Sequence, residues 1–216
     1  MSDSFMLAAR VPMTREGFEA WLDAAVPGVE VVANPGEMFT GWFWDGSSSA
    51  DRWDRLDADT TAREFFAECV EESCAGRSTT VVLLHREGAL EAYLFEVGYD
   101  EYTMHTAMLL LAGAGRFRSE PGDDYVLFWA ETSGALLKPS SDAWLAVLSV
   151  GQEGARFVGR VDLAETVAAL KPAEERFYAL IERMAEDEEE WDADAGEPFA
   201  AETPRDALFV DAEVLR

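Results

Sequence analysis

The alternation of apolar and polar residues is clearest over residues 79–114, where it predicts two strands, a tight turn and a buried helix. Residues 79–85 are apolar on both alternating faces, as is typical of an interior strand that is covered on both sides. Residues 90–97 alternate again after Gly88, which can supply the positive φ that a hairpin turn needs. Residues 101–114 carry almost no charge, so we expect a helix that packs inside the protein.

Two segments before this hairpin have helical periodicity. Thr14 is a candidate N-cap for a helix over residues 14–26, whose apolar side chains recur on one face. Residues 60–75 form a second amphipathic helix, which contains Cys69 and Cys74. Two cysteines five positions apart on a helix point in different directions, so we expect free thiols and no disulfide between them.

Short alternating runs, separated by Gly, Pro, Asn and Ser, predict further strands. We expect them at residues 5–11, 29–33, 38–44, 125–131, 144–150 and 155–161. Connections this short favour antiparallel pairing. The order helix, strand, strand recurs over residues 14–44, 60–98 and 101–150, without sequence identity between the copies. The predicted fold class is therefore α+β, with a mainly antiparallel sheet, recurring helix–strand–strand units and helices packed on the sheet.

The C-terminal part of the chain combines an amphipathic helix with a run of acids. Residues 162–170 predict a short helix, and a last helix begins near Pro172. The inner face of that last helix carries Phe177, Leu180, Ile181 and Met184. Eight of the twelve residues in 186–197 are acidic, and negative charge is unfavourable at a helix C-terminus. We therefore predict a single compact domain over residues 1–190 and an acidic segment over residues 191–216, partly docked.

Composition makes a folded, soluble protein the expectation. Hydrophobic residues make up 49% of the 216 positions, which is ample material for a core. The first residues do not resemble a signal peptide, and no apolar run reaches the roughly 18 residues of a membrane span. We therefore expect a cytoplasmic location.

Charge is the most unusual property of the sequence. There are 43 acidic and 17 basic residues, a formal net charge of −26, and the excess is divided equally between the two halves of the chain. Such a field repels nucleic acid and anionic membranes, and it speeds the encounter with a basic partner by about 10- to 1,000-fold at low salt. The charge therefore indicates a basic protein partner, with no direct nucleic-acid or membrane contact.

A second interpretation of the acidity needs no partner. Only two lysines accompany fifteen arginines, a usage that a GC-rich or salt-adapted genome also produces, with the charge serving solubility. Seven tryptophans and thirteen phenylalanines are not explained in this way.

Motifs for catalysis are missing from the sequence. It contains no phosphate-binding loop, no dinucleotide-binding glycine motif after a strand, no G-x-S-x-G and no C-x-x-C. The two histidines, His85 and His105, are expected to be structural. They support one alternative, an enzyme or small-ligand-binding protein, if the hairpin and the buried helix bring both into one pocket with Glu96, Asp100 or Glu101. Because these motifs are missing, we predict no enzyme, no catalytic residue and no cofactor. We also predict no metal, because the aspartates of residues 45–59 lack calcium-loop spacing.

Two stretches are candidates for a partner-binding surface. Residues 39–59 interleave aromatic rings with aspartates across a Gly/Ser loop, and such surfaces bind Arg and Lys by stacking and ion pairing. Residues 182–197 offer a row of negative charge comparable to a phosphate backbone. The simpler interpretation of residues 39–59 is a core strand followed by a capped loop. The simpler interpretation of residues 182–197 is a run of solvated charges. The predicted partner-binding residues are Trp42, Trp44, Asp45, Asp51, Trp53, Asp54, Asp57, Asp59, Glu186, Asp187, Glu188, Glu189, Glu190, Trp191, Asp192 and Asp194.

These features together predict an acidic cytoplasmic interaction protein. Distributed negative charge without a catalytic motif is typical of immunity or antitoxin-type inhibitors, which block a basic nuclease or another toxin that acts on nucleic acid.

Overall fold

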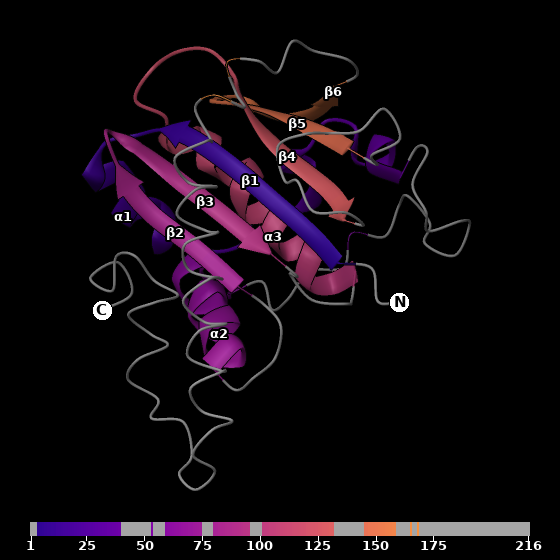
Figure 1. The fold of residues 1–216 in the computed structure, drawn as a ribbon. Helices are drawn as coiled ribbons and strands as arrows, with labels where there is room; N and C mark the ends of the chain where they lie inside the picture. Colours follow the sequence, from indigo (N-terminus) through magenta and orange to yellow (C-terminus); the bar gives the residue numbers. More distant parts are fainter. Residues whose placement is uncertain are drawn as a thin grey trace, which may run out of the picture.

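A single antiparallel sheet of six strands carries three α-helices in the computed structural model of this protein (Figure 1). The structure describes residues 4–39, 53, 59–74, 80–95, 101–131, 145–158, 165 and 168. The strands are β1 (Ser4–Pro12), β2 (Thr80–Arg86), β3 (Ala89–Phe95), β4 (Asp124–Glu131), β5 (Leu145–Gly151) and β6 (Gly154–Val158). The α-helices are α1 (Arg15–Leu22), α2 (Ala62–Cys74) and α3 (Glu101–Ala114). The α+β fold class predicted from the sequence is confirmed.

The strand order is β2-β3-β1-β4-β5-β6, so the first strand of the chain lies inside the sheet. Ala9 of β1 faces Ala92 of β3 on one side and Val126 of β4 on the other. Pro12 is the last residue of β1, where its missing N–H costs the ladder least. The two halves of the sheet are therefore joined through the N-terminal strand.

All three α-helices pack on one face of the sheet. Alternate residues of the strands, such as Leu7, Ala92 and Phe128, join side chains of α1, α2 and α3 in one buried cluster. In Figure 1, α1 and α3 lie behind the strands. The indole Nε1 of Trp21 on α1 donates a hydrogen bond of 3.0 Å to the carbonyl oxygen of Leu110 on α3. This bond fixes the two helices to each other within the core.

The hairpin and the buried helix match their predictions closely. β2 and β3 turn at Glu87 and Gly88, which have φ values of 51° and 71°, the conformation that suits a two-residue hairpin. Every residue from Met104 to Gly115 is buried, as expected for an apolar helix inside the fold. Thr14 caps α1 as predicted, because its hydroxyl accepts a hydrogen bond of 3.0 Å from the N–H of Gly17. The side chain of Cys69 is buried.

The predicted strand at residues 29–33 is wrong, and so is the start of the one at 38–44. The chain forms two 3-10 helices there, η1 (Val29–Val31) and η2 (Pro35–Phe39); a third, η3 (Gly115–Phe117), follows α3. The segment pairs with β6 through an isolated bridge of Val32 with Ala155, in which the N–H of Ala33 donates to the carbonyl of Ala155 at 2.8 Å. The Asn34 amide adds two bonds to Phe157: it donates to the carbonyl at 2.9 Å and accepts from the N–H at 2.8 Å. Residues 40–44 lie outside the described residues.

Two smaller predictions also need correction. β2 was expected to be an interior strand, but it is at the edge of the described sheet. Leu83 and Leu84 point to opposite faces of the sheet and are both buried. The apolar pattern therefore indicated correctly that both faces of β2 are covered, but it did not indicate how many strands pair with β2. α1 ends at Leu22, and the chain then runs beside the start of α2, where Ala25 bridges Thr61. Ala25 lies beyond the end of α1 and is exposed.

Candidate functional site

Most of the predicted partner-binding residues lie outside the described part of the chain. Trp53 and Asp59 are the two that the structure describes. Trp53 is only 8% exposed, and its ring stacks on His105 at a centroid distance of 4.8 Å and an interplanar angle of 17°. Asp59 is exposed beside the start of α2. Trp53 thus contributes mainly to the core, and the surface formed by the other fourteen residues stays a prediction.

The two histidines occupy separate packed environments. A ring nitrogen of His85, Nε2, lies 2.9 Å from the carbonyl oxygen of Met13, and the ring packs against Phe18 at 5.4 Å. His105 is fully buried in α3 beneath the ring of Trp53. Neither histidine lines the two pockets that the structure describes. The alternative of a shared histidine pocket gains no support from these contacts.

Exposed carboxylates greatly outnumber exposed arginines on the described surface. The exposed acids are Glu16, Asp23, Glu30, Glu37, Asp59, Glu64, Glu68, Glu87, Glu120, Asp123, Glu153 and Glu165, twelve in all. The exposed bases are Arg15, Arg116 and Arg156, three in all. The acids belong to several helices, turns and loops, so the negative potential is spread over the surface and is not confined to one element.

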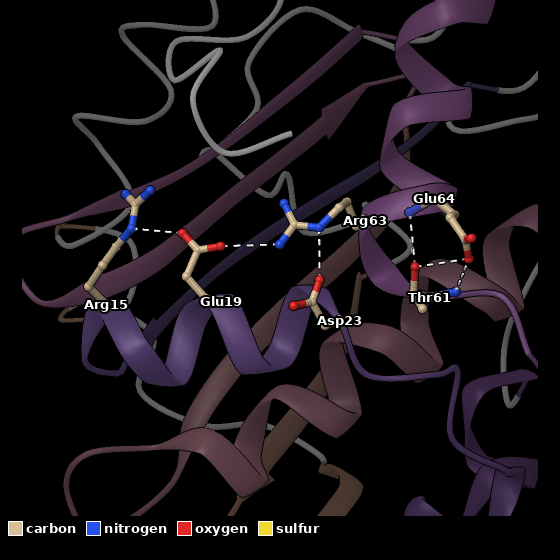
Figure 2. Close-up of polar contacts among 6 residues, drawn as sticks. All are labelled: Arg15, Glu19, Asp23, Thr61, Arg63 and Glu64. Carbon is tan, nitrogen blue, oxygen red and sulfur yellow. Dashed lines mark hydrogen bonds and ion pairs between the residues drawn. The ribbon is translucent and has the colours of Figure 1, made fainter. Parts of the chain in front are cut away.

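Part of the surface charge joins α1 to α2. Figure 2 shows the guanidinium of Arg63 between two carboxylates of α1: its Nη2 is 3.1 Å from Glu19, and its Nε is 2.8 Å from Asp23 at the helix end. Arg15 also bonds Glu19, at 2.9 Å. Burial opposes the charge of Arg63, but the hydrogen bonds that it donates to Asp23 and Glu19, and the negative charge of both, outweigh this effect and raise the pKa of Arg63. This arginine is therefore held as a structural link between the helices.

The first turn of α2 carries a capping box, which is also drawn in Figure 2. The N–H of Glu64 donates to the hydroxyl of Thr61 at 3.2 Å, and the N–H of Thr61 donates to the carboxylate of Glu64 at 2.9 Å. The Thr61 backbone and hydroxyl hydrogen bonds lower the pKa of Glu64. The motif T-A-R-E at residues 61–64 is visible in the sequence and could have located this helix start.

An open polar groove lies at the end of the sheet formed by the β5–β6 turn. Its volume is about 540 Å³, and its charged lining residues are Glu30, Asp123, Glu153 and Arg156. Asp123 accepts a hydrogen bond of 2.7 Å from the hydroxyl of Ser149. Glycine shapes this end, because Gly154 has a φ of 138° and an added Cβ would lie 3.0 Å from the carbonyl oxygen of Val31. The groove is a second acidic surface that sequence reasoning did not find.

A buried ionic cluster occupies the sheet face opposite the α-helices. Glu91 of β3 is 1% exposed, and its carboxylate lies 2.8 Å from Nη2 of Arg86 and 3.5 Å from Nε of Arg10. The two arginines come from the flanking strands β2 and β1 and are each about one quarter exposed. Sequence reasoning missed this cluster, although an acid in the middle of the apolar run 89–95 was a signal that a partner charge must lie nearby.

Another buried arginine fixes the loop before β4. Arg118 is 8% exposed and pairs with Asp124, the first residue of β4. Burial lowers the pKa of Arg118, against the raising effect of Asp123 and Glu120. Five of the seven described arginines are therefore held in ion pairs: Arg10, Arg15, Arg63, Arg86 and Arg118.

The described residues show neither a metal site nor a membrane-spanning helix, and the chain has no match among known proteins. No group of three or more His, Cys, Asp or Glu side chains in the described ranges is placed to hold a metal ion. None of the helices in that part of the chain is long and apolar enough to cross a membrane. No protein-family model, no curated protein and no solved structure matches the sequence or the fold.

Proposed function

We propose that this protein is an acidic interaction protein of the immunity or antitoxin type. It binds and blocks a basic partner, such as a nuclease or another toxin that acts on nucleic acid, and it works in the cytoplasm. The observation that carries the proposal is the ratio of twelve exposed carboxylates to three exposed arginines on the described surface.

The physical basis of the proposal is long-range attraction. Negative potential on many sides of a rigid body steers a cationic partner toward it before any contact forms. The formal net charge of −26 already includes every arginine, so the potential at a distance remains negative after the ion pairs are counted. A basic nuclease has the complementary charge, because its own substrate is a polyanion.

Adaptation to salt is the competing explanation, and stability separates it from binding. If the acidity serves only a salty cytoplasm, repulsion among carboxylates should destabilise the protein at low ionic strength. Thermal unfolding in about 0.1 M and about 1 M salt, between which the Debye length falls from about 10 Å to about 3 Å, tests this. An inhibitor should keep its fold at both ionic strengths.

Binding is tested with the protein encoded beside this one in its genome, using isothermal titration calorimetry. An unrelated basic protein is the control for non-specific attraction. We expect tight association with the neighbouring gene product that weakens as salt rises, and loss of that protein's toxicity on co-expression. The absence of binding to it, or an affinity no greater than that of the unrelated protein, would refute the proposal.

Charge neutralisation at two surfaces tests where the partner binds. The loop variant carries Asp51→Asn, Asp54→Asn and Asp57→Asn. The matched control removes the same number of charges at the groove end, with Glu30→Gln, Glu120→Gln and Glu153→Gln. If the predicted loop contacts the partner, the loop variant raises the dissociation rate, whereas the control mainly slows association. Equal effects of both variants on both rates would mean that the loop is not the contact surface.

A further inference from the structure

The sheet has two buried faces, but the three α-helices cover only one of them. On the opposite face, one row crosses four strands and consists of Tyr93, Ala8, Leu127 and Val147, which face one another in register. Each of these side chains is at most 6% exposed. Leu84 of β2 is also buried, at 3%. Within the described residues, the core cluster that contains the α-helices includes none of these five side chains.

A segment of the same chain is the first candidate for the cover of this second face, because its residues are buried in a single copy of the protein. Each of the internal ranges outside the description is short, at most 13 residues, as in 132–144. By contrast, 58 residues follow Val158, and of these only 165 and 168 are described, both helical and exposed. The C-terminal stretch is the one with enough length to cover four strands.

The sequence of this stretch contains a suitable apolar surface. From Pro172, the side chains of Phe177, Leu180, Ile181 and Met184 recur on one side of a predicted helix. Residues 172–184 would form a helix about 20 Å long, comparable to the width of four to five strands. With the predicted helix over residues 162–170, the connection from Val158 to Pro172 can span up to about 30 Å, which exceeds the width of the six strands, about 24 Å.

Charge also favours this arrangement. The cluster of Arg10, Glu91 and Arg86 lies on the second face and has one positive charge in excess. The predicted helix contains Glu174, Glu175 and Glu182 against Arg176 and Arg183, a net charge of −1, and it is followed by the acidic run. The net negative charge of this helix, together with the acidic run that follows it, therefore complements a buried face whose polar cluster is cationic.

We propose that residues 172–184 form an amphipathic helix that docks on the second face of the sheet through Phe177, Leu180, Ile181 and Met184. The docked helix makes the fold a three-layer arrangement of helices, sheet and helix. It also fixes where the acidic residues after position 186 begin on the body of the protein. This inference does not depend on the proposed inhibitory function.

Hydroxyl-radical footprinting of the full chain, read by mass spectrometry, tests the docking. The perturbing variant is Leu180→Asp, and the matched control is Ala179→Asp, which introduces the same charge on the opposite side of the predicted helix. We expect oxidation of Tyr93 and Leu84 to rise several-fold in Leu180→Asp and to stay at the wild-type level in Ala179→Asp. Met108 and Trp21, on the α-helical face, should stay protected in both variants.

Three outcomes would overturn the proposal. Protection of Tyr93 and Leu84 that is unchanged in Leu180→Asp would assign the cover to another segment. Equal exposure in both variants would mean that position 180 has no special role. Protection in the wild type that is lost on dilution would assign the cover to a second copy of the chain. Should Leu180→Asp expose Met108 as well, the milder Leu180→Ala is used, and its failure to raise Tyr93 oxidation selectively counts against docking.

Discussion

Replacing Glu91 with glutamine removes the one carboxylate that separates Arg10 from Arg86 in the buried cluster. The amide keeps the shape of the side chain but leaves two guanidinium groups facing each other without an anion. Removing one partner of a buried ion pair costs about 3–5 kcal/mol. Both arginines are about one quarter exposed, so solvent screens part of the effect, and we expect Glu91→Gln to lower the unfolding free energy by about 3 kcal/mol.

Urea unfolding followed by circular dichroism measures this change. A loss of about 3 kcal/mol, with an m value of about 3 kcal/mol per M, lowers the midpoint by about 1 M. Glu19→Gln is the matched control, because it removes the same charge from an exposed pair and should cost at most about 1 kcal/mol. A double-mutant cycle with Arg86→Gln isolates the pair energy. A midpoint shift for Glu91→Gln no larger than that of Glu19→Gln would refute the reasoning.

Three further predictions concern turns, a bridging side chain and a helix cap. Gly154→Ala should cost about 2–3 kcal/mol because of its positive φ and the crowded Cβ position, whereas Gly88→Ala, with open space around it, should cost about 1 kcal/mol; similar losses in thermal unfolding would contradict this. Asn34→Ala removes two hydrogen bonds to the β6 backbone and should cost about 2 kcal/mol, with faster amide exchange in β6; unchanged exchange would count against it. Glu64 has a lowered pKa, so its stabilising contribution is present above pH 4.5 and is lost as pH falls through its folded pKa; the stability difference between wild type and Glu64→Gln should therefore shrink with acid, and a widening difference would contradict the assignment.

Elements with strong local patterns were predictable from the sequence. α3 was predicted because a helix of 14 nearly uncharged residues is too short to cross a membrane, so its apolar side chains must be buried in the protein core. The hairpin was found because Gly88 sits between two alternating runs and has the positive φ that the turn demands. In both places the local preference and the tertiary environment agree.

Features that depend on distant residues were not predictable. Residues 29–33 have strand-like composition, but they contact β6 through a single backbone bridge and the side chain of Asn34, and no local signal gives the Asn34 partner 123 positions away. The edge position of β2 is likewise set by the order of the strands and not by its own apolar pattern.

The candidate site was predictable only as a property of the whole surface. The excess of acids in the sequence indicated the exposed carboxylates, but Trp53 showed no sign that it would stack on His105. Interleaved aromatic and acidic residues are compatible with a surface or with a core edge, and spacing alone does not distinguish them. Glu91 could have been recognised as buried from its apolar neighbours, but its partner Arg10 is 81 positions earlier in the chain.

The central place of β1 has a consequence for synthesis on the ribosome. Its two neighbours in the sheet end at Phe95 and Glu131, so 119 residues must be added after Pro12 before both are available. At about 5–20 residues per second, this takes roughly 6–24 s. During that interval the nascent chain displays an apolar strand with at least one unpaired edge, and such a segment is prone to aggregation and is a target for chaperones.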